Sequence, residues 1–442
     1  MRARRPIVPG LIVVLFSTAA WAQKGKILEQ NLASGEGYTV MRVWGSHLEM
    51  GQAQGQLLAR EIVAGAAEVK QTVGAVYATL RAQMSVAVWA PAEIEQELDG
   101  IVDGVKTAQP TATIDKVDLK IVNTYGDWSY ACRSHSAWGS FVGGTTKTLS
   151  TRRLDFSVPI TLNTTRHHLL LARDPSDGSV RWVNLAWPGY VVSVTGVNEY
   201  GTLASLHDYQ SSLAIGAHMP RTVAVRYALT AVRDLPLEKH LDTVFAELTK
   251  HTISTGTFIN YYVPEGHGGV LTCPAGQKCS KLRKPQADYF NGEVLITTND
   301  ETDGHSTPAG GEFMESYYKA GGPKTITDHQ ALMGHSGMHL ITVDYRRRGD
   351  MTLWAEGRVS TGVTPTIKVE WSQLFPAGAQ PGTDGGQTAS DGGQTPSDGG
   401  SGTDGGGDSD GCALTFSAAP GGLWGGVLLL ALLALTVLGR RR

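Results

Sequence analysis

Residues 130–139 read Tyr-Ala-Cys-Arg-Ser-His-Ser-Ala-Trp-Gly, and residues 152–156 read Arg-Arg-Leu-Asp-Phe. The first stretch places one thiol, Cys132, ahead of the Arg-x-x-Asp pattern that Arg152 and Asp155 form in the second. A lone cysteine in this arrangement indicates a nucleophile that becomes active when the chain is cut in front of it. We therefore expect a precursor whose active part begins at Cys132.

The first 22 residues predict a secretory signal peptide. Three arginines among the first five residues precede an apolar run over residues 7–20, and Ala-Trp-Ala at residues 20–22 has the small-x-small form of a cleavage site. A membrane anchor is the alternative, but the run is shorter than the roughly 20 residues that span a bilayer. We expect export, with Gln23 as the first mature residue.

The C-terminal end of the chain has three parts. Residues 376–411 repeat Ser-Asp-Gly-Gly and Thr-Asp-Gly-Gly and offer no apolar surface to offset the entropy of ordering, so they predict a flexible linker. A Gly-Cys pair ending at Cys412, an apolar segment over residues 423–438 and three terminal arginines follow. This order resembles the myxobacterial C-terminal sorting signal and covers residues 412–442.

The resemblance of the tail implies where the protein is sent. Export and sorting machinery would process the tail near Cys412 and deliver the protein to the cell surface. The segment 423–438 is short for a membrane span, and the arginines after it would hold its end on the cytoplasmic side, so it predicts a permanent or transient membrane anchor.

Residues 23–375 lie between these ends and suffice for one large domain or two small ones. The net charge of -3 and the lack of a Lys/Arg-rich stripe argue against a nucleic-acid partner. Cys273 and Cys279 flank a short Pro-Ala-Gly-Gln-Lys segment, and in an exported protein two thiols that close such a loop favour a disulfide. With Cys412 in the tail, Cys132 remains, and the alternative to a nucleophile is a buried free thiol.

The hydrophobic pattern predicts helices before Cys132 and a mixture dominated by strands after it. Ser-His-Leu-Glu at residues 46–49 has the form of a capping box, and Gly51 and Gly55 then share a helix face that permits close packing. Pro91 begins a second helix, and Gly-Gly at residues 143–144 predicts a hairpin. Strands are predicted at residues 137–142, 148–156, 168–172, 180–186, 191–195, 202–206, 257–263, 294–297, 340–345 and 351–355, and later helices at residues 222–232 and 237–248. This order predicts an α+β sandwich with two antiparallel sheets inside and helices outside.

Five motifs then match a known family in order. They are Gly-Ser-His-Leu-Glu-Met-Gly at residues 45–51, Cys132 with Ala-Trp-Gly at residues 137–139, the stretch at residues 152–156, Gly-Val-Asn-Glu-Tyr-Gly at residues 196–201, and Thr-Asn at residues 298–299. The chain resembles the self-processing isopenicillin N acyltransferase-like family, whose relatives include choloylglycine hydrolases and penicillin V acylase. This implies the four-layer αββα fold of N-terminal-nucleophile hydrolases, with residues 23–131 as a helical pro-segment and residues 132–375 as the catalytic chain.

The resemblance also implies a mechanism. Cys132 would attack the carbonyl of Ala131, and hydrolysis after an N-to-S acyl shift would free its α-amine. A free α-amine has a pKa of about 7.7 to 8.0, so near neutral pH it can act as a general base. The mature protein would then form a thioester from an acyl amide and pass the acyl group to water or to an amine. Water is the expected acceptor because transfer demands a site that excludes it; no cofactor is expected.

The family resemblance assigns roles to further residues. Arg152 and Asp155 are expected to face the nucleophile, Asp155 holding the new ammonium group and Arg152 orienting the thiol. The alternative for this pair is a surface ion pair of little energetic value. Asn299 matches an asparagine that binds the tetrahedral oxyanion, a donor whose loss elsewhere costs about 2.7 to 4 kcal/mol; the alternative is a turn-forming residue.

The second oxyanion donor is less clear from the sequence. The corresponding position, downstream of Asn198, falls near Asp208, and an ionised carboxylate cannot donate a hydrogen bond. Either the neighbouring His207 supplies the donor, or the oxyanion hole is built differently. Asn198, His207 and Asp208 are therefore the candidates for oxyanion or substrate contacts.

No metal site is expected, and two other interpretations stay open. His335 and His339 are four residues apart but lack the glutamate that a metalloprotease motif places after its first histidine. The first alternative is a surface-anchored protein that binds a ligand on the same scaffold without catalysis. The second is a cysteine hydrolase of another kind, papain-like or directed at peptidoglycan. A papain-like enzyme would pair Cys132 with a distant histidine, but no family-specific context around Cys132 supports such a pair.

Overall fold

The computed structural model describes residues 23–124, 130–156, 166–213, 218–299, 311–334 and 337–377, all of which belong to one compact unit. The predicted signal peptide, most of the linker and the predicted sorting signal, including Cys412, lie outside these ranges and stay predictions. Within these ranges, no helix is both long enough and apolar enough to span a membrane. The predicted membrane segment at residues 423–438 is not among them.

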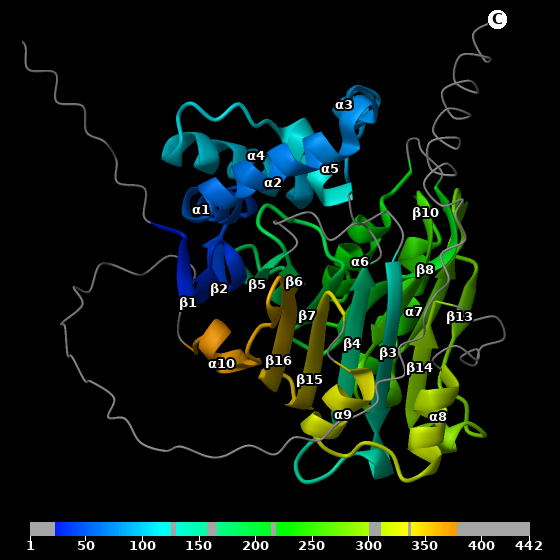
Figure 1. Ribbon diagram of the computed structural model, residues 1–442. Helices are drawn as coiled ribbons and strands as arrows, with labels where there is room; N and C mark the ends of the chain where they lie inside the picture. The colour runs from blue at the N-terminus through cyan, green and yellow to red at the C-terminus, as the bar shows by residue number, and fades with distance from the viewer. Residues whose placement is uncertain are drawn as a thin grey trace, which may run out of the picture. The chain divides into compact units, whose positions relative to one another are not determined.

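Two large sheets form the centre of the fold (Figure 1). The nine-stranded sheet has the order β1 (Gly25–Ala33), β2 (Glu36–Gly45), β5 (His167–Pro175), β6 (Trp182–Ala186), β7 (Thr195–Asn198), β8 (Leu203–Leu213), β10 (Thr255–Tyr262), β11 (Gly269–Cys273), β13 (Lys281–Arg283). The seven-stranded sheet has the order β14 (Val294–Thr298), β3 (Tyr130–Trp138), β4 (Thr148–Phe156), β15 (His339–Arg347), β16 (Asp350–Val359), β17 (Gly362–Val363), with β18 (Ile367–Glu370) also on β16. A small pair consists of β9 (Thr252–Ile253) and β12 (Gln277–Lys278).

Helices cover the outer faces of both sheets. The helices are α1 (His47–Leu57), α2 (Ala59–Val73), α3 (Tyr77–Val86), α4 (Ala92–Ala108), α5 (Lys116–Thr124), α6 (Arg221–Thr230), α7 (Leu237–Leu248), α8 (Gly311–Lys319), α9 (Ile326–Met333) and α10 (Trp371–Leu374). Helices α1 and α6 pack on the nine-stranded sheet, and α8 and α9 pack on the seven-stranded sheet. The predicted α+β sandwich, two sheets between helical layers, is confirmed.

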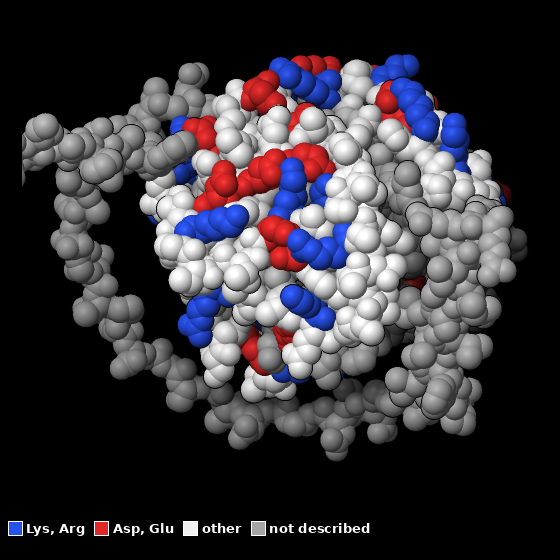
Figure 2. All heavy atoms as spheres, turned by 90° about the horizontal axis from the view of Figure 1, so that it is seen from above, with Lys and Arg blue, Asp and Glu red and all other residues white. Residues whose placement is uncertain are grey.

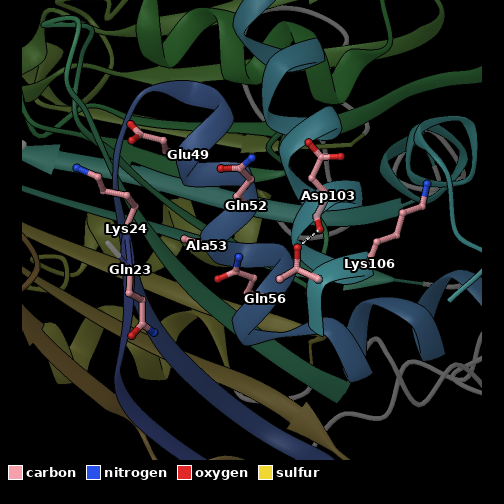
Figure 3. A pocket seen from close by; sticks show the side chains of 9 residues that line it. Gln23, Lys24, Glu49, Gln52, Ala53, Gln56, Asp103 and Lys106 are labelled. Atoms are coloured by element: carbon pink, nitrogen blue, oxygen red, sulfur yellow. Dashed lines mark hydrogen bonds between the residues drawn. The ribbon is translucent and has the colours of Figure 1, made fainter. Parts of the chain in front are cut away.

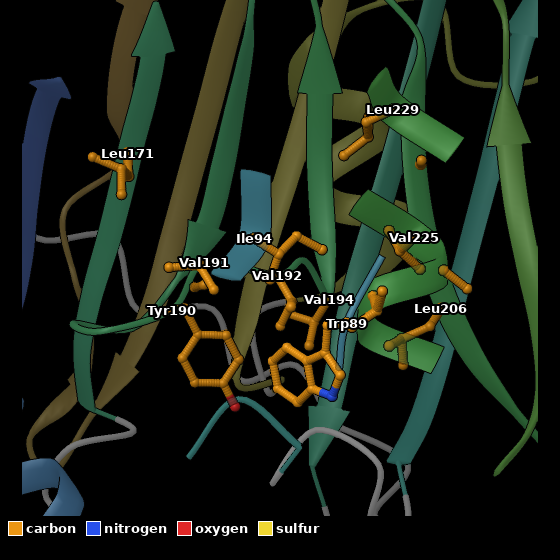
Figure 4. Close-up of a cluster of buried hydrophobic side chains, with 14 of the residues drawn as sticks. Trp89, Ile94, Leu171, Tyr190, Val191, Val192, Val194, Leu206, Val225 and Leu229 are labelled. Atoms are coloured by element: carbon orange, nitrogen blue, oxygen red, sulfur yellow. The ribbon is translucent and has the colours of Figure 1, made fainter. Parts of the chain in front are cut away.

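Three buried apolar clusters match the three interfaces of this four-layer arrangement. The largest lies mainly between the nine-stranded sheet and the helices that cover it, and it extends to Cys132 and Leu154 of the seven-stranded sheet. Figure 4 shows part of it around Trp89, Tyr190 and Leu206. A second joins the inner faces of the two sheets. A third places Ala137 and Leu340 of the seven-stranded sheet against α8 and α9. Alternate residues of each strand therefore serve different cores, as expected of a sheet covered on both faces.

Helices α1 and α4 pack very closely, as the glycine spacing predicts. The capping box of Ser46 and Glu49 at the start of α1 is present. A Cβ atom at Gly51 would lie 2.2 Å from the backbone oxygen of Glu97, and one at Gly104 would lie 2.2 Å from that of Gln52. Only glycine fits these positions, because a side chain would have to enter the neighbouring backbone.

The exposed face of this helical layer carries charges of both signs. Figure 2 shows lysine and arginine side chains interspersed with acidic ones on the face seen from above. Ion pairs join Arg81 to Asp115 and Asp118, and Lys116 to Glu95 and Asp99. Such paired and solvated charges contribute little stability each.

The segment before Cys132 is more than a helical pro-segment. It begins with strands β1 and β2, which the sequence did not reveal. Strand β2 pairs with β5 in parallel, from Gly37 opposite His167 to Gly45 opposite Pro175. Among the strands described, β2 and β5 run parallel, whereas the other strand pairs of the two large sheets are antiparallel. The segment therefore completes the nine-stranded sheet, and its removal would leave β5 as an open edge.

The predicted strand at residues 137–142 is wrong in its bounds. Strand β3 runs from Tyr130 to Trp138, and the next residue, Gly139, has a φ of 60° that breaks the extended conformation. Hydrophobic periodicity missed most of β3 because its inward side chains include Cys132 and Ser134. Cys132 consequently lies within a strand, where the hydrogen-bonded ladder fixes its position.

A buried carboxylate, Glu97 of α4, joins the two halves of the chain. It accepts hydrogen bonds from Arg226 at 2.6 Å and 3.0 Å, from Arg173 at 3.1 Å, and lies 2.8 Å from His47 Nδ1. Burial alone would raise the pKa of Glu97, but the guanidinium groups of Arg226 and Arg173 outweigh burial and lower it. Because Glu97 precedes Cys132 and both arginines follow it, this cluster connects α4 to β5 and α6.

We predict that Glu97→Gln lowers the free energy of unfolding by about 3 to 5 kcal/mol, because it leaves two buried guanidinium groups without their anion. Asp99→Asn on the same helix is the control: its carboxylate is about half exposed and pairs with Lys116, so a loss of about 1 kcal/mol or less is expected. Urea unfolding in a Cys132→Ala background, which keeps the chain in one piece, measures both. Equal effects of the two substitutions would contradict the role of Glu97.

Candidate active site

Cys132 lies on the inner face of β3, between the two sheets. It stands opposite Leu154 of β4, its thiol is free, and the residue is 6% exposed. The strand before it and after it is hydrogen-bonded to β4 in unbroken register from Tyr130 to Trp138. The peptide bond between Ala131 and Cys132 is thus held inside a strand.

Arg152 reaches the thiol from the neighbouring strand. Its Nη2 donates to Cys132 Sγ at 3.2 Å and to the carbonyl oxygen of Leu206 at 3.1 Å, and its Nη1 lies 3.0 Å from His339 Nε2. The guanidinium has no exposed surface. A buried cation beside a sulfur favours the thiolate form of that sulfur.

Asn299 holds the backbone of the cysteine. Its Oδ1 accepts a hydrogen bond from the Cys132 backbone N–H at 3.1 Å, just beyond the end of β14. This nitrogen is the one that a cut after Ala131 would turn into an α-amine. The structure thus brings Cys132, Arg152 and Asn299 together.

Asp155 lies on the other face of β4. Because β4 pairs with β3 without a bulge, Arg152 and Asp155 cannot both point inward. Asp155 instead accepts a hydrogen bond from Arg153 Nε at 2.7 Å, and Arg153 also donates to the carbonyl oxygen of Met333. The expectation that both residues of the pattern face the thiol therefore does not hold in this structure, where Asp155 stands opposite Ala131 in the register.

The surroundings make the thiol of Cys132 a weak acid. Burial raises the pKa of Cys132 to about 11; Arg152 and Arg221 oppose this effect, whereas Asp208 and Asp155 add to it. At neutral pH the thiol is therefore protonated. Any change that exposes Cys132 to water removes the largest contribution and lowers its pKa.

His207 and Asp208 of β8 lie near the thiol but are engaged with other groups. His207 Nε2 is 3.0 Å from Ser134 Oγ, and burial together with Arg152 keeps the pKa of His207 well below 6.5, so the ring is neutral. Asp208 forms a buried ion pair with Arg221, the first residue of α6. The carboxylate is thus an ion-pair partner, and Arg221 brings a second guanidinium to the neighbourhood of the thiol.

Asn198 shapes a turn. Its Oδ1 accepts from the backbone N–H groups of Tyr200 and Thr202, and its Nδ2 donates to the carbonyl oxygen of Leu229. These bonds tie the turn between β7 and β8 to α6. Asn198 therefore holds a turn next to β8, the strand that carries His207 and Asp208.

A buried polar layer next to Cys132 escaped the sequence analysis. Ser134 Oγ contacts Tyr262 at 2.9 Å and accepts from Asn260 at 3.0 Å, and Tyr262 lies 3.0 Å from Thr297 Oγ1. These groups join β3 to β10 and β14 between the sheets. Polar residues at alternate positions of β3 and β10 were the only signal, and such a pattern normally predicts an exposed face.

His339 also belongs to the site, although the sequence pattern suggested for it only a metal-binding role with His335, which was rejected. It lies on β15 opposite Leu154, with its Nε2 against Arg152. His335, its proposed companion, lies outside the described residues. Within the described ranges, no group of three or more metal-binding side chains is assembled.

The described part of the chain contains cavities at the helical layer and beside His339. One of about 660 Å³ opens between the start of β1, α1 and α4, where Figure 3 shows Lys24, Glu49, Asp103 and Lys106 around it. Its lining residues belong to residues 23–24, α1 and α4 and do not include Cys132, Arg152 or Asn299. A second, of about 10 Å³, is lined by His339 and Glu356. A disulfide joins Cys273, the last residue of β11, to Cys279, which lies between β12 and β13.

The sequence matches no protein-family model and no curated protein. Among solved structures, an orthologue of N-acylethanolamine-hydrolysing acid amidase from Caenorhabditis elegans is similar over 48% of this chain and 92% of its own, with 14% identity and a TM-score of 0.35. A likeness of this size carries no argument about activity. The fold is assigned from the strand order, and the candidate site is assigned from the contacts of Cys132.

We predict that acid destabilises this protein before its carboxylates titrate. Burial lowers the pKa of His168 to about 4 and that of His329 to about 3, whereas an unfolded histidine has a pKa near 6.5. The unfolded chain therefore binds protons that the native chain cannot, and stability that is complete above pH 6.5 is lost as the pH falls. Each such histidine contributes about 1.4 kcal/mol per pH unit below 6.5.

Urea unfolding at pH 7.5 and pH 5.5 measures this effect. His329→Gln, which removes one buried histidine that stacks on His135 at 4.6 Å, reduces the slope of stability against pH. A stability that is level or rises between these pH values would contradict the prediction.

Proposed function

We propose that this protein is a cysteine amide hydrolase of the N-terminal-nucleophile type, activated by its own cleavage between Ala131 and Cys132. One observation carries the proposal: Arg152 contacts the Cys132 thiol while Asn299 Oδ1 accepts from the Cys132 backbone nitrogen. Two groups of Cys132 thus have partners suited to catalysis. The Arg152 guanidinium lies beside the sulfur and would stabilise a thiolate, and the Asn299 side-chain oxygen lies beside the nitrogen and would hold an amine.

In the cleavage step, Cys132 Sγ attacks the carbonyl carbon of Ala131. The bond from this carbon to the Cys132 nitrogen breaks, the thiol proton goes to that nitrogen, and a thioester forms. Water then hydrolyses the thioester to the carboxylate of Ala131 and restores the thiol. The products are two chains, the second of which begins with the free amine of Cys132.

Cleavage changes the chemistry of the thiol. The new amine acts as the base that takes the proton of its own thiol, since a pKa of about 7.7 to 8.0 leaves part of it unprotonated near neutral pH. Asn299 Oδ1, already bonded to this nitrogen, holds the amine. Opening the site to water would lower the pKa of the thiol from about 11, with Arg152 as its cation.

The mature residue then cleaves acyl amides. Cys132 Sγ attacks the amide carbonyl, the ammonium group returns its proton to the departing amine, and a thioester remains until water hydrolyses it. We assign Asn299 Nδ2 as a donor to the tetrahedral oxyanion, so that both ends of this side chain take part. Water is the proposed acceptor of the acyl group.

Two features support continued association of the two chains after cleavage. Strand β2 stays paired with β5 across the cut, and Glu97 stays bonded to Arg173 and Arg226. Breaking this buried cluster would leave charges without partners, which is costly. We propose that the fragments form one stable heterodimer.

Export to the cell surface remains part of the proposal. The disulfide between Cys273 and Cys279 supports an oxidising compartment, because such bonds are rare in reducing ones. The signal peptide and the sorting signal near Cys412 are the sequence features that support delivery to the surface.

We predict that the purified wild-type chain separates into two fragments under denaturing conditions and that Cys132→Ala remains one chain. Cys412→Ser is the matched control, since it removes a cysteine that has no part in the reaction, and it should cleave as the wild type does. Denaturing gels and intact mass measure all three. A wild type that stays in one piece would overturn the self-cleavage.

Substrate tests separate an enzyme from a binding protein. We predict that the cleaved protein hydrolyses at least one of a panel of fatty-acyl amides, penicillins and bile-salt conjugates, that Cys132→Ala hydrolyses none, and that Asn299→Ala lowers kcat about 10²- to 10³-fold. Release of the amine product measures the rates. Binding of a panel member without hydrolysis would favour the binding protein on the same scaffold.

A further inference from the structure

We propose that the backbone N–H of Asp155 is the oxyanion donor of the self-cleavage step, held by the strand ladder against the carbonyl oxygen of Ala131. This inference rests on the proposed function and deepens it, because it assigns a catalytic group to the bond that Cys132 attacks. It concerns the backbone of residue 155, whose side chain bonds to Arg153 on the other face of β4.

The two ends of the scissile peptide bond face different strands. Strand β3 lies between β14 and β4 (Figure 1). The nitrogen of the bond, that of Cys132, donates to Asn299 Oδ1 on the β14 side. In a trans peptide the C=O and N–H groups point in opposite directions, so the carbonyl oxygen of Ala131 points to β4. Asn299 therefore lies on the opposite side of β3 from this oxygen.

The backbone of Asp155 meets this carbonyl from β4. The carbonyl oxygen of Leu154 accepts from the N–H of Met338, directly before β15, at 2.6 Å. The peptide that joins Leu154 to Asp155 consequently turns its N–H the opposite way, toward β3. The register places Ala131 directly opposite Asp155, and such a pair of an antiparallel ladder exchanges N–H···O=C bonds when its groups face each other. The Asp155 N–H is thus the ladder donor to the scissile carbonyl.

An N–H at this place stabilises the charge that self-cleavage creates. When Cys132 Sγ bonds to the carbonyl carbon of Ala131, the π electron pair moves to the oxygen. This oxyanion persists until the bond to the Cys132 nitrogen breaks and that nitrogen takes the thiol proton. A donor that is already fixed beside the oxygen needs no reorganisation to stabilise it. The N–H is fixed because β4 is paired on both sides, with β3 and with β15.

Strand β4 also balances the charges around the reacting atoms. The Asp155 carboxylate accepts from Arg153 Nε at 2.7 Å, and this ion pair offsets the negative charge next to the scissile bond. Arg152, on the inner face of the same strand, contacts the sulfur. One strand thus supplies a guanidinium to the nucleophile and a backbone N–H to the carbonyl that it attacks.

Replacement of single backbone N–H groups by ester oxygens tests this donor. Cell-free translation of the full-length chain with the α-hydroxy acid counterpart of aspartate at residue 155 keeps the side chain and removes the N–H, and an ester oxygen cannot donate. The matched control is the α-hydroxy acid counterpart of leucine at residue 149. Leu149 stands opposite Ala137 an even number of residues along the same ladder, so its N–H also faces β3.

The readout is the rate at which the newly made chain separates into two fragments on denaturing gels. The ester at residue 155 should cut about 10²- to 10³-fold more slowly than the wild type, the effect of losing one oxyanion donor. The ester at residue 149 should cut at the rate of the wild type. Because each ester removes one bond of the same ladder, a purely structural role of the Asp155 N–H would slow both chains alike.

The outcomes separate this donor from self-cleavage itself. An ester at residue 155 that cuts as fast as the wild type, or two esters that are slowed equally, would overturn the donor and leave self-cleavage intact. A wild type that stays in one piece would overturn self-cleavage and the donor with it.

Hydrogen exchange of the Asp155 amide, measured in a Cys132→Ala chain, tests the contact without any cleavage. The bond to the Ala131 carbonyl predicts exchange as slow as that of the Leu149 amide. Exchange as fast as in an unfolded chain would overturn the donor. This measurement decides the point even where the ester at residue 155 does not fold, as judged by near-ultraviolet circular dichroism.

Discussion

The buried guanidinium of Arg152 is the constraint on which the centre of this structure depends. A cation without exposed surface is stable only when its N–H groups find acceptors, and the acceptors come from β3, β8 and β15. These contacts fix how the two sheets stand against each other next to Cys132. In the proposed mechanism, the thiolate that Cys132 forms after cleavage is the anion that this buried guanidinium would neutralise.

A second buried charge cluster, around Glu97, serves the architecture. It joins the segment before Cys132 to the segment after it, together with the parallel pairing of β2 and β5. Under the proposed cleavage after Ala131, these contacts would remain, because none of them depends on that peptide bond. In this proposal Arg152 serves the thiol, and Glu97 holds the two parts of the fold together.

The sequence predicted the layered fold well where hydrophobic periodicity decides the structure. The capping box at Ser46, the close approach at Gly51 and the helix at Leu237–Leu248 all follow from local pattern. Strands β1 and β2 escaped because burial does not alternate along them: most residues of β1 are exposed, and most residues of β2 are buried. Most of strand β3 and the polar layer around Ser134 were not predicted, because polar side chains occupy the inner face of β3. Apolar side chains would fill that face in an ordinary core.

The candidate site was predicted in part. The order of motifs pointed to Cys132, Arg152 and Asn299, which the structure brings together. It did not reveal His339, since no spacing in the chain links β15 to β4 before the sheet is known. The regular register of β4 likewise places Asp155 away from the thiol, a consequence of strand alternation that motif matching does not take into account.

The N-terminal residue of the larger fragment is the measurement that tests the central claim most directly. N-terminal sequencing of that fragment from the purified wild-type protein should give Cys132 followed by Arg133 and Ser134. A fragment that begins at any other residue, or a chain that begins only where a signal peptide ends, would contradict the assignment of Cys132 as the nucleophile of its own activation.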